Sequence, residues 1–192
     1  MTELSRGATV KVMKKSFGLA PWGPHLWTRE KARELRPKLV AQLESLEPGG
    51  TVVVDFAGIE AFDYSFINEL VGKTLLSLPG EYPGRMLVAE HLSDYTRENL
   101  EKALEGMSLA MVERKGSGLR LLGKLHAVDR ETFAAIAGAK EAVTAAELKD
   151  RFEVNLTAMN ERLSKLTGLG LLYREKSISA AGREQYSYRA PS

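Results

Sequence analysis

Asp63 and Ser65 stand two positions apart, after an apolar segment that ends in Asp55 and before an amphipathic segment. This spacing places a carboxylate and a hydroxyl in the first turn of a helix, where unpaired amides and the positive end of the helix dipole favour a phosphate group. Ser65 is therefore a candidate phosphorylation or switch site, with Asp63 beside it. Ser65 could instead serve only as the N-cap, because serine is common there. Glu69, one turn later, would repel a phosphate on Ser65.

Other residue types with catalytic potential do not form a recognisable constellation. His25, His91 and His126 are far apart in the sequence, and the chain contains no cysteine. His91, Ser93 and Asp94 have the residue types of a catalytic triad, but the members of a triad must converge in space rather than in sequence. The sequence therefore predicts no catalytic residue, no metal site and no cofactor, and we do not expect an enzyme.

A second set of polar residues lies in the last third of the chain. Thr144 and Glu147 have the spacing of a capping box, and Asn155 is placed to cap the next helix. This helix has an apolar seam on one side and a small polar surface on the other. We expect the polar surface to face the solvent, with a reach suited to a DNA groove. The seam consists of Leu156, Met159, Leu163 and Leu166, and the polar surface of Thr157, Ala158, Asn160, Glu161, Ser164 and Lys165.

The hydrophobic pattern indicates the elements that position these residues. Strands are predicted at 8–13, 51–56 and 85–89, with 109–112 and 119–122 as a hairpin. Helices are predicted at 29–46, 65–78 and 96–107, the second ended by Pro79-Gly80, with Phe66, Leu70, Leu75 and Leu76 pointing inward. Beyond about residue 125, three helices (127–139, 144–152 and 155–167) precede a hairpin of 171–173 with 185–188. This order predicts an α/β domain with a mixed sheet at 1–124 and an α+β domain at 125–192.

Composition excludes several classes of protein. The chain has 192 residues and a net charge of +2, which does not suit a basic tail that coats nucleic acid by charge alone. No run of apolar residues is long enough to span a membrane, and the first residues do not form a signal peptide. We therefore expect a cytoplasmic protein that does not bind a membrane.

The segment from Val52 to Gly72 contains a buried strand, a short loop and the run Asp63-Tyr-Ser-Phe-Ile-Asn-Glu-Leu70. It resembles the STAS fold of anti-sigma-factor antagonists, and more closely the STAS-like relatives with an SFxxEL ending. The resemblance covers about residues 8–122. It implies a protein partner, such as a kinase that phosphorylates the serine at the position of Ser65. Tyr64 and Phe66 depart from the Asp-Ser-Ser-Gly pattern of the family.

The segment from Val143 to Tyr188 resembles the winged helix-turn-helix domains of bacterial and archaeal transcription regulators. The resemblance rests on the run LxKLxxLGLL from Leu163 to Leu172, followed by a charged hairpin. In that family the third helix enters the major groove of double-stranded DNA and the hairpin reaches the backbone or minor groove. Residues implied to contact bases are Thr157, Asn160 and Glu161. Those implied to contact phosphates are Arg162, Lys165, Arg174, Lys176 and Arg183.

Residues 152–192 include six basic and four acidic side chains, a small excess for a surface that binds a duplex. A homodimer would double this excess. We therefore expect a DNA-binding transcription regulator in which the STAS-like domain receives a signal. We expect it to bind as a homodimer, because a lone recognition helix reads few base pairs. One alternative is an adaptor in which neither domain binds nucleic acid. Another is an enzyme or effector-binding protein with a pocket between the sheet and the loop from Trp22 to Trp27.

Overall fold

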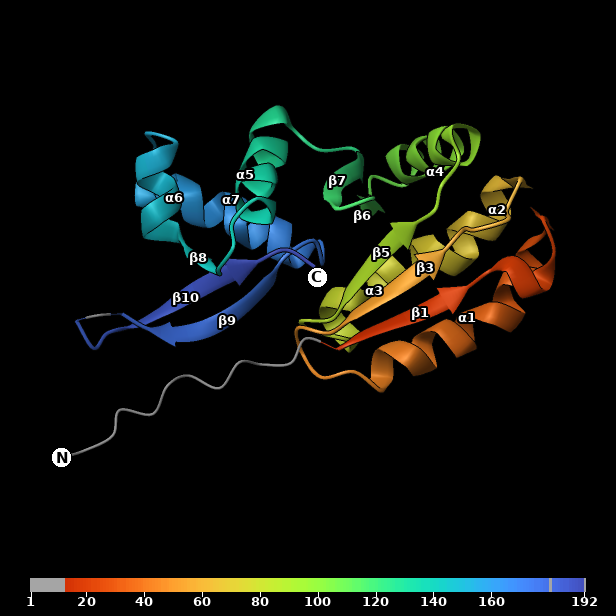
Figure 1. Cartoon of the computed structure of the whole chain (residues 1–192), viewed down its shortest axis with the longest axis horizontal. Helices are drawn as coiled ribbons and strands as arrows, with labels where there is room; N and C mark the ends of the chain where they lie inside the picture. Colours follow the sequence, from red (N-terminus) through yellow and green to blue (C-terminus); the bar gives the residue numbers. More distant parts are fainter. Residues whose placement is uncertain (1–12, 180, 192) are drawn as a thin grey trace.

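Five strands form the larger β-sheet of the computed structural model, which describes residues 13–179 and 181–191 (Figure 1). The strand order is β1-β3-β5-β6-β7. Strands β1 (Lys14–Gly18), β3 (Thr51–Asp55), β5 (Met86–Glu90) and β6 (Ala110–Lys115) are parallel, and β7 (Gly118–Gly123) is antiparallel to β6. The predicted mixed-sheet α/β fold is confirmed.

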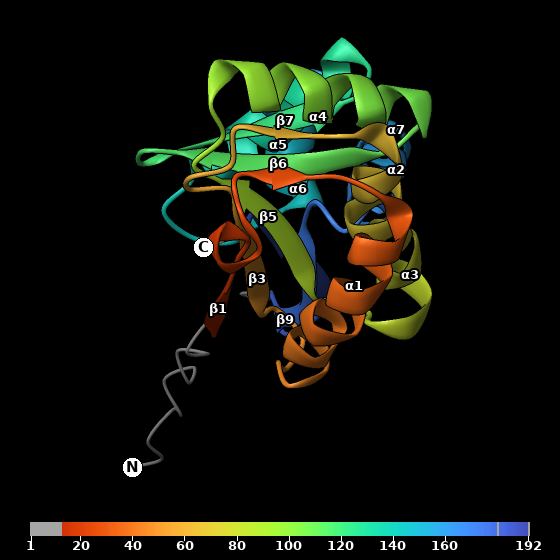
Figure 2. The same cartoon turned by 90° about the vertical axis from the view of Figure 1, so that its right-hand side faces the viewer.

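One face of this sheet carries a layer of helices, which we call the helix layer (Figure 2). Its members are α1 (Arg29–Glu44), α2 (Tyr64–Ile67), the π-helix η2 (Asn68–Gly72), α3 (Lys73–Glu81) and α4 (Asp94–Gly106). The 3-10 helix η1 (Ala20–Trp22) and the paired short strands β2 (His25–Leu26) and β4 (Ala61–Phe62) complete this part of the chain.

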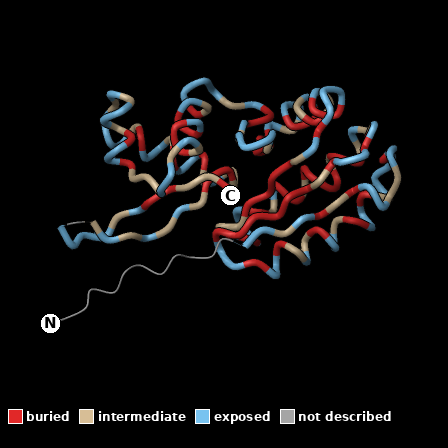
Figure 3. The backbone as a smooth tube through the Cα atoms, viewed as in Figure 1, coloured by how far each residue is buried: buried red, intermediate tan, exposed pale blue. Residues whose placement is uncertain are grey.

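Local sequence explains where these elements start and why the strands lie inside. The Thr28 hydroxyl accepts a hydrogen bond from the Lys31 amide at the start of α1, and Ser93 accepts one from the Thr96 amide at the start of α4. The β-branched run in β3 is buried on both of its faces (Figure 3). A strand buried in this way belongs in the middle of a sheet that is covered on both sides.

The C-terminal part, which we call the C-terminal module, contains three helices and a small sheet. Its elements are α5 (Ala127–Ala137), β8 (Val143–Thr144), α6 (Ala145–Arg151), α7 (Leu156–Gly168), β9 (Tyr173–Ile178) and β10 (Glu184–Arg189). The sheet order is β8-β10-β9, and the hairpin β9–β10 extends away at the lower left of Figure 1. The predicted capping box of Thr144 and Glu147 and the predicted Asn155 cap are both present.

The C-terminal module packs against the second face of the larger sheet. Val53, Val88, Val112 and Leu121 of that face share one hydrophobic cluster with buried residues of α5, α6, α7 and β10. The boundary expected at 124/125 falls in the connection between β7 and α5, but the hydrophobic core continues across it. A chain cut at this point would therefore lose the cover of one face of its sheet.

Gly49 also joins the two parts, because side chains of the C-terminal module lie against it. Gly49 is buried and has a φ of +91°, and a Cβ atom there would lie 2.6 Å from Nη2 of Arg189. Arg189 in turn lies over the ring of Tyr173, 4.8 Å from its centroid. The positive φ favours glycine at this position, whereas the flexible Arg189 side chain could move to make room for a Cβ atom.

Several predicted elements need correction. The strand predicted at 8–13 falls outside the described residues except for Met13, which is not in a strand, and the first strand described is β1. The predicted helix end at Pro79-Gly80 is wrong, because α3 continues to Glu81. Leu76 does not point inward, since 65% of it is exposed. The π-helix η2 precedes it and adds a residue to one turn, which shifts the buried stripe relative to a regular helix.

Candidate functional site

Asp63 is the N-cap of α2 and holds three separate groups. Its Oδ1 accepts hydrogen bonds from the Phe66 amide at 2.6 Å and from the Ser65 hydroxyl at 2.9 Å. Its Oδ2 accepts one from the Thr28 amide at 3.0 Å, at the start of α1. Partial burial opposes ionisation of this carboxyl, but the hydrogen bonds from Thr28, Phe66 and Ser65 outweigh it and hold the pKa of Asp63 below its ordinary value.

The interpretation of Ser65 as the helix N-cap is wrong. Asp63 occupies the cap position, and Ser65 lies inside the first turn, where its hydroxyl donates to the Asp63 carboxylate. A phosphate on Ser65 would lose this hydrogen bond and place two further negative charges beside a carboxylate. The cap of α2 and the contact with Thr28 would both be weakened. A change in the charge of Ser65 would therefore alter the contacts that hold the starts of α1 and α2 together.

Glu69 is not a free negative charge beside Ser65. Its side chain is 1% exposed and is surrounded by four cations, with Lys73 Nζ at 2.7 Å from Oε2. Burial opposes its ionisation, but Lys73, Arg33 and Arg36 lower the pKa of Glu69 below its ordinary value. We call this group, with its four cations, the Glu69 cluster. The Nε atoms of Arg36, Arg33 and Arg29 lie 3.6, 3.8 and 4.0 Å from its carboxylate oxygens.

The Glu69 cluster leaves a positive surface at the α1–α3 side of the helix layer. One carboxylate balances only one of the four cations, whose side chains remain 37% to 59% exposed. Arg29, Arg33 and Arg36 repeat at four and three residues along α1, so they share one side of that helix. This spacing is visible in the sequence, but their convergence on Glu69 depends on the packing of η2 against α1.

A cavity of about 300 Å³ lies next to the start of α2. It is lined by Phe62 and Tyr64 on one side and by Tyr95, Asn99, Lys102 and Ala103 on the other. Tyr64 and Tyr95 are 53% and 60% exposed. Exposed tyrosines at a groove are frequent in protein interfaces, because they bury a large area at little entropic cost. Their exposure could not be predicted from the sequence, since it depends on the fold.

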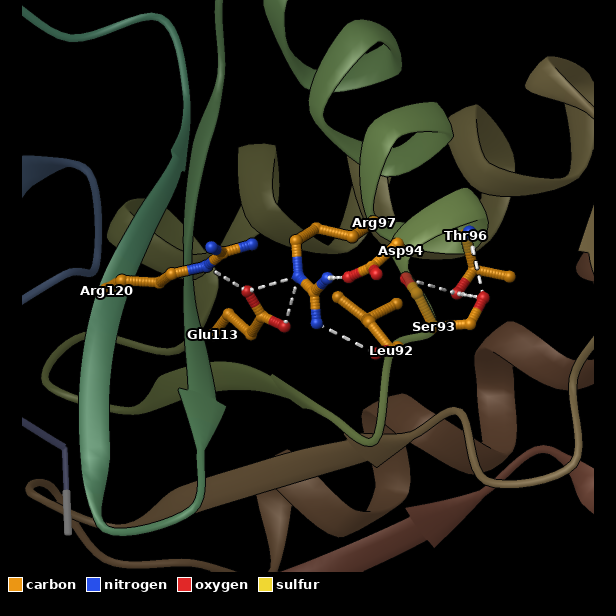
Figure 4. Close-up of polar contacts among 7 residues, drawn as sticks. All are labelled: Leu92, Ser93, Asp94, Thr96, Arg97, Glu113 and Arg120. Carbon is orange, nitrogen blue, oxygen red and sulfur yellow. Dashed lines mark hydrogen bonds and ion pairs between the residues drawn. The ribbon is translucent and has the colours of Figure 1, made fainter.

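An ionic network around the buried side chains of Arg97 and Glu113 joins α4 to the edge of the sheet (Figure 4). Arg97 donates from Nε to Glu113 at 2.8 Å and from Nη2 to the carbonyl of Leu92 at 2.9 Å, and it also pairs with Asp94. Arg120 pairs with the other side of the Glu113 carboxylate. Burial disfavours the charged form of Arg97, but Glu113 and Asp94 raise its pKa above the ordinary value. Two cations and two carboxylates balance here, so the network carries no net charge.

His91, Ser93 and Asp94 do not form a triad, because each side chain contacts a different partner. Nδ1 of His91 lies 2.7 Å from Oδ1 of Asp55, while Ser93 caps α4 and Asp94 pairs with Arg97. His91 has a φ of +59°, an unusual conformation for a residue with a side chain. Among residues 13–179 and 181–191, no group of three or more His, Asp or Glu side chains is placed to hold a metal ion.

The tryptophans of the loop before α1 have different environments. Trp22 stacks on Phe17 with ring centroids 5.5 Å apart and packs against the core of the helix layer. Trp27 is 48% exposed and stacks on His25 at 5.9 Å. Trp22 thus covers one end of the sheet, whereas Trp27 remains on the surface.

The polar side of α7 faces the solvent. Thr157, Asn160 and Glu161 are exposed, while Met159 and Leu163 on the opposite side are fully buried. The seam predicted for this helix is buried at Met159, Leu163 and Leu166, but Leu156 at its start is 45% exposed. The three candidates for base contacts therefore share one accessible surface.

The candidate phosphate contacts have unequal surroundings. Nζ of Lys165 lies 2.5 Å from Oδ2 of Asp129, a carboxylate that is 4% exposed. Lys176 lies 3.8 Å from Glu184 across the hairpin, and Arg174 lies over the ring of Tyr186 at 4.4 Å. Arg162 is half-buried and Arg183 is exposed. Arg174, Lys176 and Arg183 belong to the hairpin and its tip, whereas Lys165 is held by α5.

Comparison with known proteins identifies a domain in the N-terminal part. A family model described as a STAS-like domain of unknown function (DUF4325) matches residues 31–97. The matched range begins in α1, ends at Arg97 in α4 and includes Asp63, Ser65 and Glu69. It is shorter than the resemblance expected over residues 8–122. A search of curated proteins found no match to the chain.

Proposed function

We propose that the chain is a cytoplasmic, DNA-binding transcription regulator in which the STAS-like domain receives a signal and the C-terminal module binds double-stranded DNA. The observation that carries this proposal is the exposed polar side of α7 beside the extended β9–β10 hairpin. The element order α5-β8-α6-α7-β9-β10 is also that of a winged helix-turn-helix. In this proposal α7 enters the major groove.

The proposed contacts divide into two kinds. Thr157, Asn160 and Glu161 on α7 would face the base edges, where Asn suits adenine and Glu suits the cytosine amino group. Arg162 and the hairpin cations would bind phosphates. Lys165 would contribute less than the others, because Asp129 already neutralises it at 2.5 Å. The affinity would therefore depend mainly on the hairpin cations Arg174, Lys176 and Arg183.

The signal would reach the C-terminal module through the larger sheet. Val52 and Val54 of β3 contact the core under the helix layer, while Val53 between them contacts the core under the C-terminal module. The two cores thus lie on opposite faces of the same strand. A protein partner, such as a kinase acting on Ser65, would alter the start of α2 and could shift this strand. Close-packed cores transmit such displacements.

The test is fluorescence titration of the full chain against a random labelled duplex over a series of salt concentrations. We expect binding that weakens with salt, because phosphate contacts release counterions. The double variant R174A/R183A should bind more weakly and lower the salt slope by about 2. The matched control K115A/K124A removes two exposed lysines of the larger sheet and its following loop and should bind as the wild type does. Absence of salt-sensitive binding would refute the DNA part of the proposal.

A second function, protein docking by the C-terminal module, has one observation in its favour. A cavity of about 220 Å³ lies between the starts of α6 and α7 and strand β10, lined by Leu156, Asn160 and Tyr186 among others. Leu156 and Tyr186 are 45% and 42% exposed. This surface is more apolar than a DNA-binding surface normally is. In the titration above, L156A should leave DNA binding nearly unchanged if the first proposal holds.

A further inference from the structure

The outer side of the helix layer carries opposite charge at its two edges. At the α1 edge, the Glu69 cluster presents the partly exposed side chains of Arg29, Arg33, Arg36 and Lys73. At the α4 edge, four carboxylates repeat at intervals of four, three and four residues, which places them along one side of the helix. We call this series the acidic stripe, and it consists of Asp94, Glu98, Glu101 and Glu105.

Part of the acidic stripe is already paired within the chain. Asp94 binds Arg97, and Glu98 lies 2.6 Å from Lys102. For Glu101 and Glu105, the described part of the chain provides no ion pair within 4.0 Å. The stripe therefore keeps two carboxylates available for cations of another molecule.

Large apolar side chains lie on the same surface between the two charged edges. Leu76 of α3 is 65% exposed, and Tyr64 of α2 is 53% exposed. Tyr95, at the start of α4, is 60% exposed and lines the same 300 Å³ cavity as Tyr64. Three exposed large side chains on one helix layer, bordered by charge on both sides, are typical of a protein interface.

We propose that the helix layer is the surface on which two copies of this chain associate, with the α1 edge of each copy against the α4 edge of the other. A two-fold axis forms every such contact twice. Two helix layers can face each other about a two-fold axis in two ways. In one, α1 of each copy lies opposite α1 of the other copy; in the second, α1 of each copy lies opposite α4 of the other. Only the second brings the Glu69 cluster against the acidic stripe.

The groove between α2 and α4 suits an arginine of the α1 edge. Guanidinium groups stack on aromatic rings, and Tyr64 and Tyr95 offer two rings in this groove. Lys102 also lines the groove, but its ammonium group is already paired with Glu98 at 2.6 Å. Arg29 and Arg33 are bound to Glu69 only at 4.0 and 3.8 Å, so each retains donors for the other copy. The interface thus combines charge complementarity at its edges with apolar contact around Leu76.

This arrangement would leave the C-terminal module uncovered, because that module packs on the opposite face of the sheet. It would also bring Ser65 to the interface, next to Tyr64. The inference goes beyond the proposed DNA binding and does not depend on it. Association can be measured without DNA, so the failure of one proposal is distinguishable from the failure of the other.

A charge exchange between two variants tests the interface by sedimentation velocity of the full chain over a concentration series. R29E/R33E retains Arg36 and Lys73, the two cations nearest to Glu69, and E101K/E105K changes two carboxylates without a partner in the chain. Each variant alone should associate about tenfold more weakly than the wild type or worse, because like charges meet at both contacts. An equimolar mixture should recover the dimer, because both contacts then join opposite charges.

The control E131K/E141K makes the same change in net charge on exposed residues of the C-terminal module and should associate as the wild type does. Circular dichroism establishes that each variant is folded. A mixture that stays monomeric would overturn the proposal, and so would variants that dimerise normally or a wild-type chain that is monomeric at every concentration. Y64A should weaken association without a change in charge.

Discussion

The hydroxyl of Ser65 donates a 2.9 Å hydrogen bond to Asp63, the residue that caps α2 and also holds the Thr28 amide. A change in the charge of Ser65 would therefore act directly on the Asp63 carboxylate, which joins the starts of α1 and α2. A neutral hydroxyl supports this carboxylate, whereas an anion at the same position would oppose it.

The first prediction concerns the charge of Ser65. S65E should reduce the free energy of unfolding by about 0.5–2 kcal/mol, the usual cost of losing an N-cap, because a second carboxylate competes with Asp63 for the amide of Phe66. S65A loses only one hydrogen bond and should cost about 1 kcal/mol or less. Urea denaturation measures both, with S117E in the exposed β6–β7 turn as the control. A larger decrease in the free energy of unfolding for S65A than for S65E would contradict this account.

The second prediction concerns the pH dependence of stability. The pKa of Asp63 lies below its ordinary value of 3.8 in the folded chain. Its ionised form therefore stabilises the fold above pH 3.8, and this contribution is lost as the pH falls through the folded pKa. D63N preserves an N-cap residue but removes the charge. The difference in urea midpoint between wild type and D63N should shrink as the pH is lowered from 7 to 3, and a constant difference would refute the role of the charge.

Features that depend on neighbouring residues could be predicted from the sequence. The capping box of Thr144 and Glu147 and the Asn155 cap are local, and the apolar run of β3 indicates a central strand. The mixed-sheet fold follows from such signals. Leu76 was misplaced because the π-helix η2 shifts the stripe of buried residues, and a helical pattern of constant period cannot show this.

Features that depend on tertiary packing could not be predicted from the sequence. Ser65 and Asp63 were both candidates for the start of α2, and only the backbone decides which is the cap. The four cations of the Glu69 cluster come from two helices, α1 and α3, that are separated in the sequence by β3, β4, α2 and η2. The exposed polar side and the apolar seam of α7 were expected, but the surfaces that cover the seam, α5 and the larger sheet, were not.

The third prediction concerns the ionic network around Glu113. E113Q would leave the buried Arg97 with only the exposed Asp94 as a countercharge and should lower the free energy of unfolding by about 3 kcal/mol. E131Q, on an exposed residue, should change it by less than about 0.5 kcal/mol. The double variant R97M/E113L should cost less than the sum of R97M and E113L measured singly, because it removes both charges. Additive costs in this double-mutant cycle would show that Arg97 and Glu113 do not interact.

The fourth prediction concerns the core shared by the larger sheet and the C-terminal module. L163A should lower the free energy of unfolding by about 2–5 kcal/mol, whereas I178A, at a 67% exposed position, should change it little. Trp22 and Trp27 both lie in the N-terminal part, so their fluorescence reports that part alone. The tryptophan transition should shift together with the transition seen by far-ultraviolet circular dichroism. Separate transitions would show that the two parts unfold independently.

The fifth prediction separates the structural role of Lys165 from a role in DNA binding. Asp129 is 4% exposed, and Lys165 is its cation at 2.5 Å, so K165M should destabilise the chain by leaving a buried carboxylate without a partner. D129N/K165M removes both charges and should recover most of that stability. If Lys165 binds no phosphate, the double variant should also bind duplex DNA with the salt slope of the wild type, as measured in the titration described above. A slope lower by about 1 would instead assign Lys165 to the DNA-binding surface.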